Sequence, residues 1–274
     1  MRKIMLVTLA VLVGMALISC GNDNGGSDNG GDGASVGYVP NQTAVAYAYT
    51  HGGYVGMATV EVDGDGNLDV EIDEAFLPHT LAIVDMESGD WTEDNTVYYV
   101  QRGEQARVAR WVSYDGTNYV GVNAGGAMVY VEAAEDGSPR VDPGESRWSA
   151  QDLEQIILQN QSTMAAWYEN IADGGFAVMT AADASPTPVT TTSYGSLTKE
   201  GSEYWNFGIG WQGNIDAIEE TIEENGGAFK LDEMVRTDEG TWELADATTS
   251  ATASDLPDYV NVVQTALGRL EIYR

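Results

Sequence analysis

The stretch from Thr43 to Glu74 constrains the fold most strongly, because apolar and polar residues alternate along it. β-Branched and aromatic residues dominate AVAYAYTHGGYVGMATVEV, and LDVEID resumes the alternation. The interruptions, His51-Gly52-Gly53 and Asp63-Gly64-Asp65-Gly66-Asn67, have the composition of turns. We therefore expect consecutive antiparallel hairpins. Further strands are predicted at Thr96–Gln101, Arg107–Tyr114, Tyr119–Val122 and Ala127–Ala133, with a turn at Asp115-Gly116.

The second half of the chain changes to helical spacing. We expect Ser149 to cap a helix with Asp152 in its first turn, and Asn214 to cap a second helix. A last helix is predicted in LPDYVNVVQTALGRL, with Pro257 in its first turn. The predicted fold class is therefore α+β, with antiparallel hairpins first, then helices, and a helix at the C-terminus. The Pro/Thr-rich residues 184–193 are the candidate internal boundary.

The first residues resemble a bacterial lipoprotein signal. MRK is a short basic segment, and IMLVTLAVLVGMAL is an apolar run too short for a stable membrane span. The sequence Leu-Ile-Ser then precedes Cys20, the chain's one cysteine. The resemblance implies a signal peptide over residues 1–19 and acyl chains such as palmitate on Cys20, which would anchor the chain in a bilayer. Residues 20–37 are expected to be a flexible Gly/Asn/Asp linker before a folded part over residues 38–274. An ordinary secretory signal with an incidental cysteine is the alternative.

Charge and composition exclude several functions. The chain has 12 Lys and Arg against 43 Asp and Glu, so its field repels nucleic acid and no nucleic-acid partner is expected. With two histidines and one cysteine, no zinc site or cysteine protease is expected. The sequence also lacks a nucleophile elbow and the glycine-rich motifs of nucleotide sites. A calcium loop after Asp63 fails because Leu68 stands at its sixth position, where glycine is needed. No metal site is therefore predicted.

Two segments remain as candidate sites. Tyr204, Trp205, Phe207 and Trp211 lie among glycines, so they either stack against a flat ring such as a flavin or belong to the core. The second segment is DATTSAT, at residues 246–252, followed by the last predicted helix. Local sequence leaves two interpretations open. Either Ser254 or Asp255 caps the helix after a hydroxyl-rich loop, or a hydroxyl there is modified.

The DATTSAT segment resembles the end of the FMN-binding domain family, whose pattern is D-x-x-[ST]-G-A-[ST] before a terminal helix. HGGYVGMATVEVDGDGNLDVEI, from His51 onward, is similar to the glycine-turned hairpins that open that domain. The resemblance implies an FMN-binding-domain-like fold. It also implies FMN joined by a phosphoester to Thr252, transferred from FAD by a separate magnesium-dependent flavin transferase.

The remaining motif positions follow from the same resemblance. Asp246 matches the leading acid, Thr249 the [ST] position and Ala251 the alanine, whereas Ser250 stands where the family has glycine. A glycine there permits close backbone approach or a positive φ, so the serine puts the modification in question. The resemblance covers the two ends of the folded part, and residues 73–240 match nothing functional.

These observations favour an exported, lipid-anchored FMN-binding protein that carries electrons. It would be an electron-transfer flavoprotein sooner than a stand-alone enzyme. Its expected location is the periplasmic or cell-surface face of a membrane. Its expected partners are a flavin transferase, a membrane electron donor, an unknown acceptor and the lipid bilayer. The alternative is a surface-binding lipoprotein on the same scaffold that takes no cofactor, which is consistent with Ser250.

Overall fold

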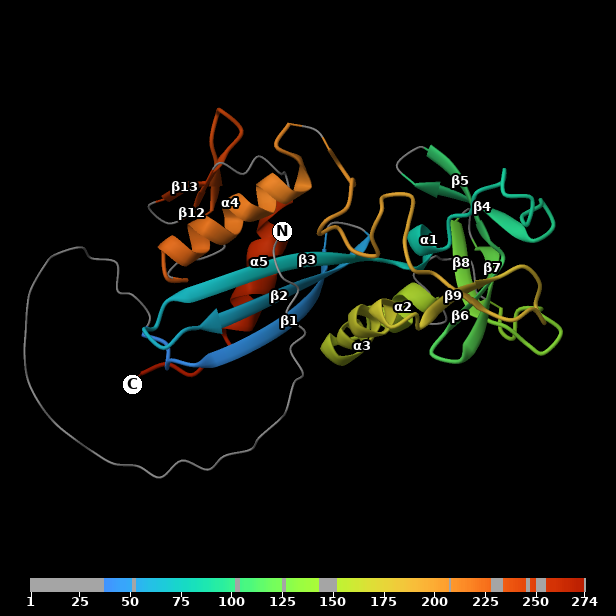
Figure 1. The fold of residues 1–274 in the computed structure, drawn as a ribbon, viewed down its shortest axis with the longest axis horizontal. Coiled ribbons are helices and arrows are strands. Elements are labelled where there is room, and N and C mark those ends of the chain that lie inside the picture. Colours follow the sequence, from blue (N-terminus) through green and yellow to red (C-terminus); the bar gives the residue numbers. More distant parts are fainter. Residues whose placement is uncertain are drawn as a thin grey trace, which may run out of the picture. The chain divides into compact units, whose positions relative to one another are not determined.

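The computed structural model describes residues 37–50, 53–101, 104–124, 127–142, 152–206, 208–227, 234–244, 247–249 and 255–273. They belong to one compact unit, Ala34–Arg274, and form an α+β fold (Figure 1). The strands are β1 (Gln42–Thr50), β2 (Tyr54–Val62), β3 (Leu68–Phe76), β4 (Thr96–Gln101), β5 (Glu104–Ala109), β6 (Trp111–Tyr114), β7 (Thr117–Ala124), β8 (Ala127–Glu132), β9 (Phe176–Met179), β10 (Thr187–Pro188), β11 (Val235–Arg236), β12 (Trp242–Leu244) and β13 (Ala247–Thr249). The helices are α1 (Pro78–Leu81), α2 (Leu153–Ile157), α3 (Gln161–Ala172), α4 (Gly210–Glu224) and α5 (Leu256–Leu267).

The alternating stretch folds as predicted, into the antiparallel sheet β1-β2-β3. The turn before β3 is held by Asp63, whose carboxylate accepts the backbone N–H groups of Asp65 (2.8 Å) and Asn67 (2.9 Å). Gly66 has φ 88°, which the turn requires and which glycine adopts without strain. The residues that suggested a calcium loop therefore form a hairpin turn.

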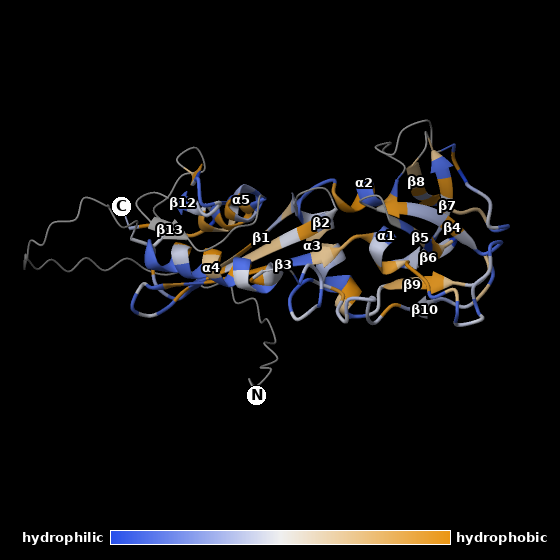
Figure 2. Cartoon of the chain, turned by 90° about the horizontal axis from the view of Figure 1, so that it is seen from above, coloured by the Kyte–Doolittle hydropathy of each residue, from blue (hydrophilic) through white to orange (hydrophobic). Residues whose placement is uncertain are grey.

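Helices α4 and α5 cover one face of this sheet. Alternate residues of the three strands point toward the helices, and their side chains together form one apolar layer. Buried residues of both helices meet them in a single core, with α5 against β1 and β2 and α4 against β3. Ile215, Ile218 and Ile222 on α4, and Tyr259 and Val263 on α5, are buried on the faces that meet the sheet. Figure 2 shows apolar and polar positions alternating along both helices.

Side chains cover both outer edges of the β1-β2-β3 sheet. On β3, Glu219 accepts the N–H of Ile72 (2.7 Å) and Glu223 accepts the N–H of Val70 (2.9 Å). On β1, the amide of Gln161 bonds to both the backbone N–H and the carbonyl of Tyr47. An exposed sheet edge would offer unpaired backbone groups to another chain. These contacts give hydrogen-bond partners to the edge groups of Val70, Ile72 and Tyr47.

A second sheet has the strand order β10-β9-β6-β7-β8, and β4 pairs with β5 beside it. The turn at Asp115-Gly116 joins β6 to β7 as predicted, with φ values of 47° and 75°. A separate core forms between these strands and helices α2 and α3. There the indole N–H of Trp167 donates to the carbonyl of Phe76 at 3.1 Å, which ties α3 to the end of β3.

The prediction of one strand over Arg107–Tyr114 was wrong. The chain turns a corner at Arg110, so β5 pairs with β4 while β6 pairs with β7 and β9. The N–H of Arg110 bonds to the carbonyl of Asn95 (2.9 Å), and its carbonyl accepts from Gly121 (2.7 Å). The backbone of Arg110 therefore passes from the hydrogen bonds of one sheet to those of the other.

Two helix boundaries also differ from the prediction. Residues 152–172 form two helices, because Asn160 caps α3 by accepting from Ser162 (2.9 Å) and Thr163 (3.1 Å). Asp152 caps α2, and Ser149 lies outside the described residues. Asn214 does not cap α4, which begins at Gly210. The Asn214 side chain is buried within that helix and donates to the carbonyl of Gly210 at 2.6 Å.

Short strands late in the chain were not expected from the sequence. β9 and β10 join the second sheet, and β11, β12 and β13 form a small antiparallel sheet before α5. β13 pairs with β12 through Trp242 opposite Thr249, and β13 lies against α4. Thr248 and Thr249 thus belong to a strand, although the local sequence indicated a loop.

Candidate functional site

The predicted FMN segment lies between β13 and α5. Thr249 is the last residue of β13, whereas Asp246, Ser250, Ala251 and Thr252 lie outside the described residues, as does Cys20. The chain is described again from Asp255, immediately before α5. The structure therefore places both flanks of the segment, one in a small sheet and one at the start of a buried helix.

The N-terminus of α5 has no side-chain cap from Asp255, which makes no capping hydrogen bond in the N-cap position. This excludes Asp255 as the cap proposed from the sequence, and Ser254 lies outside the described residues. Pro257 occupies the first turn as predicted and has no N–H to satisfy. The N–H of Asp258 bonds to the carbonyl of Asp255 at 3.0 Å. The first turn therefore depends on backbone contacts and on its side chains for its position.

Tyr259 fixes this first turn through a buried carboxylate. Its hydroxyl donates to Glu74 Oε2 at 2.8 Å, and the indole N–H of Trp211 reaches both Glu74 Oε2 and the Tyr259 hydroxyl at 3.1 Å. Burial, followed by the negative charge of Glu74, raises the pKa of Tyr259 well above its usual value, so the phenol stays protonated and donates. Since Trp211 lies in the first turn of α4, one carboxylate holds the starts of both helices.

Lys199 balances the charge of Glu74. Its ammonium lies 2.6 Å from Glu74 Oε2, and the two residues are 2 % and 0 % exposed. Thr50 donates to the other carboxylate oxygen. We call Thr50, Glu74, Lys199, Trp211 and Tyr259 the Glu74 cluster. Removing one partner from such a buried pair typically costs about 3–5 kcal/mol, because the remaining charge loses its compensation.

Aromatic rings surround the ammonium of Lys199. It lies 3.5 Å from the ring centroid of Tyr54 and 4.6 Å from that of Tyr204, whose hydroxyls are hydrogen-bonded to each other. The backbone of the same segment pairs with the end of β3, since the N–H of Lys199 donates to the carbonyl of Glu74 at 2.8 Å. The Glu74 cluster is therefore closed to a ligand of any size. It positions α4 and α5.

The aromatic residues proposed to stack a flat ring divide into two kinds. Trp211 is buried in the core, as one of the two interpretations predicted, whereas Trp205 is 36 % exposed. Trp205 also has φ 50°, an uncommon conformation for a large side chain, and its carbonyl accepts the N–H of Trp211 at 3.1 Å. Tyr204 is half-buried, and Phe207 lies outside the described residues. The structure thus brings Trp205 near the start of α4, to which Tyr259 of α5 is bonded.

A second buried ionisable pair joins α1 to α2. His79 Nδ1 is hydrogen-bonded to Glu154, and His79 Nε2 lies 3.0 Å from the carbonyl oxygen of Met128. The imidazole stacks on Tyr99 with a centroid distance of 4.7 Å. Both ring nitrogens are engaged within the protein, so this histidine has a structural role.

Sequence reasoning missed the Glu74 cluster, although weak signals were present. Tyr259 lies in the predicted last helix, and Glu74 ends the alternating stretch. Lys199 is one of only 12 basic residues against 43 acidic ones. A buried lysine in such a chain requires a carboxylate partner, but the sequence does not show which of the acids supplies it.

Within the described ranges, no helix combines the length and apolarity that crossing a membrane requires. The same residues contain no group of three or more His, Cys, Asp or Glu side chains placed to hold a metal ion. No protein-family model matches the chain. The comparison with curated proteins gives no match. The comparison with solved structures also gives none.

Proposed function

We propose that the chain is an exported, lipid-anchored FMN-binding protein that carries electrons, with FMN joined through a phosphoester to Thr252. The observation that carries this proposal is the N-terminus of α5. It begins shortly after Thr252, has no side-chain cap from Asp255, and is fixed through Tyr259 to the buried Glu74. Backbone N–H groups at a helix N-terminus bind phosphate, and their dipole favours a negative charge.

Residues at the starts of α4 and α5 would support an attached FMN. The positive end of the α5 dipole would stabilise the phosphodiester, which carries a single negative charge. Trp205 offers an exposed indole close to the start of α4, and an isoalloxazine ring can stack on such a surface. When bound, the flavin supplies the redox chemistry, and the chain supplies position and polarity. An electron-transfer protein therefore fits better than a stand-alone enzyme.

The N-terminal features complete this proposal. Lipidation of Cys20 would anchor the chain in a bilayer, and the linker over residues 20–37 would let the folded part move between a membrane electron donor and an acceptor. A flavin transferase is the partner required for maturation. The location is the periplasmic or cell-surface face of a bacterial membrane.

Intact-mass measurement tests the attachment. The chain is exported together with a magnesium-dependent flavin transferase, and we expect the mass to increase by one FMN minus one water. Thr252→Ala abolishes this increase. Thr248→Ala is the matched control, because position 248 is unconstrained in the family pattern and the increase persists there.

Ser250 favours a second candidate, a surface-binding lipoprotein that takes no cofactor. The family pattern has glycine at this position, and a side chain there obstructs a positive φ or a close backbone approach. An unmodified mass with no copurifying flavin would support this alternative. It would also contradict FMN attachment.

A further inference from the structure

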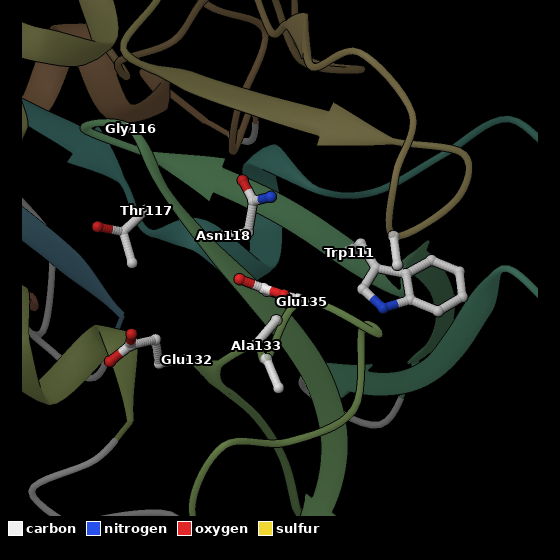
Figure 3. Close-up of a pocket in the computed structure, with 9 residues that line it drawn as sticks. Trp111, Gly116, Thr117, Asn118, Glu132, Ala133 and Glu135 are labelled. Atoms are coloured by element: carbon white, nitrogen blue, oxygen red, sulfur yellow. The ribbon is translucent and has the colours of Figure 1, made fainter.

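A pocket of about 300 Å³ lies at one end of the second sheet (Figure 3). The β6–β7 turn, the end of β8 with the turn that follows it, and Ala182 after β9 form its walls. Figure 3 shows the indole of Trp111 on one side and the side chains of Thr117 and Glu132 on the other. This volume is at the low end for ligand sites, so it suits a small molecule.

Tight turns hold both walls in place. Asp115-Gly116 has two positive φ values, as a two-residue hairpin turn requires. On the other side, the N–H of Ala134 donates to the carbonyl of Ser138 at 2.8 Å. Gly137 in that turn has φ 78°, and a Cβ there would lie 2.2 Å from the Cβ of Ala182. The pocket is therefore formed before any ligand binds, which lowers the entropic cost of binding.

Two of the lining side chains are already fixed by protein partners. The indole N–H of Trp111 donates to the carbonyl of Gly137 at 3.0 Å, so the ring offers its π surface and not a hydrogen-bond donor. The carboxylate of Glu132 is paired with Arg140, and the two charges offset each other. The Arg110 guanidinium already lies 5.8 Å from the Trp111 ring centroid, so this ring suits the apolar body of a ligand and not a second cation.

Two polar side chains of the pocket are available to a ligand. Within the part of the chain that the structure describes, no protein group binds the Asn118 amide or the Glu135 carboxylate. Glu135 therefore leaves one uncompensated negative charge at the pocket. The alanine methyl groups and the indole supply an apolar surface beside it.

We propose that this pocket binds a small organic cation, a primary ammonium group on a compact apolar body. The ammonium donates to the Glu135 carboxylate and the Asn118 carbonyl, whereas Thr117, the preceding residue on β7, directs its hydroxyl to the other side of the strand. Its apolar body contacts Trp111 and the alanines. The net charge of −31 also concentrates cations around the chain. This site is independent of the proposed FMN attachment.

Calorimetric titration of the full chain with 2-phenylethylamine tests this proposal, at about 150 mM salt to screen the general field. We expect one saturable site with a Kd on the order of 1 mM, as suits a ligand of this size in an open pocket. Glu135→Gln weakens binding about fivefold or more, through loss of the charge-assisted hydrogen bond. Glu224→Gln, which removes an exposed carboxylate from α4, leaves binding unchanged.

Two neutral compounds complete the test. 2-Phenylethanol has nearly the same shape as the amine, and we expect it to bind at least about tenfold more weakly. Methyl glucoside represents a saccharide, which would also use an indole and a carboxylate. Equal binding of the amine to wild type and Glu135→Gln would overturn the proposal, as would the absence of saturable binding. Glucoside binding that depends on Glu135 in place of amine binding would assign the pocket to a sugar.

Discussion

Glu219 on α4 is the residue whose titration most directly affects the fold. Its carboxylate accepts the N–H of Ile72 at 2.7 Å, at the outer edge of the β1-β2-β3 sheet. Burial is the largest cause that raises its pKa from 4.5 to about 7; the hydrogen bond from Ile72 opposes the shift, and the negative charges of Asp216, Glu223 and Glu71 add to it. The folded protein therefore binds a proton at Glu219 more tightly than the unfolded chain does.

The sign of the pH dependence follows from this difference. Glu219 contributes fully to stability below its unfolded pKa of 4.5, and that contribution is lost as the pH rises through about 7. The shift corresponds to at most about 3–4 kcal/mol at 1.36 kcal/mol per pKa unit. Glu219 is partly exposed, so solvent screening reduces the expected effect to about 1–2 kcal/mol.

Glu219→Gln removes the titration while keeping a carbonyl oxygen for Ile72. We expect the variant to unfold with a free energy about 1–2 kcal/mol higher than wild type near pH 8, and the difference to vanish below about pH 4. Urea denaturation followed by tryptophan fluorescence measures it. Glu220→Gln is the control, because Glu220 is exposed on the same helix. A difference that does not change with pH, or a variant less stable than wild type near pH 8, would refute the reasoning.

Three further predictions concern other positions. Tyr259→Phe removes the hydroxyl bonded to Glu74 and should lower the free energy of unfolding by about 1–3 kcal/mol. Tyr273→Phe, at an exposed position, should leave the free energy of unfolding unchanged. If urea denaturation gives Tyr259→Phe the same free energy of unfolding as Tyr273→Phe, the role of the cluster is contradicted. Asn160→Ala removes the α3 cap and should cost about 1 kcal/mol by the same assay, whereas no loss would show that Thr163 suffices. Ser250→Gly restores the family pattern and should increase the flavinylated fraction in intact-mass spectra, and a decrease would show that the glycine is not needed.

Local patterns explain which parts of the fold the sequence predicts. Alternation and glycine turns identify β1, β2 and β3, because each strand pairs with its neighbour in the chain. The helical period and Pro257 identify α5. The corner at Arg110 escapes prediction because no glycine or proline marks it between Arg107 and Tyr114. Asn214 resembled a cap because asparagine favours that position, but the core buries it inside α4.

The Glu74 cluster could not be predicted for a different reason. Its members come from β1, β3, α4, α5 and the segment before α4, so only the tertiary fold brings them together. No spacing in the sequence relates Glu74 to Lys199 or Tyr259. The FMN segment is the opposite case. Its assignment rests on a short motif, and the structure describes the two elements beside it, β13 and α5.

Mass analysis of one peptide tests the central claim most directly. Trypsin cleaves after Arg236 and Arg269 and releases residues 237–269, which contain every hydroxyl of the DATTSAT segment. After coexpression with the flavin transferase, we expect this peptide to carry one FMN, with fragment ions that assign it to Thr252. Recovery of the peptide only in its unmodified form, or assignment of FMN to another residue, would contradict the claim.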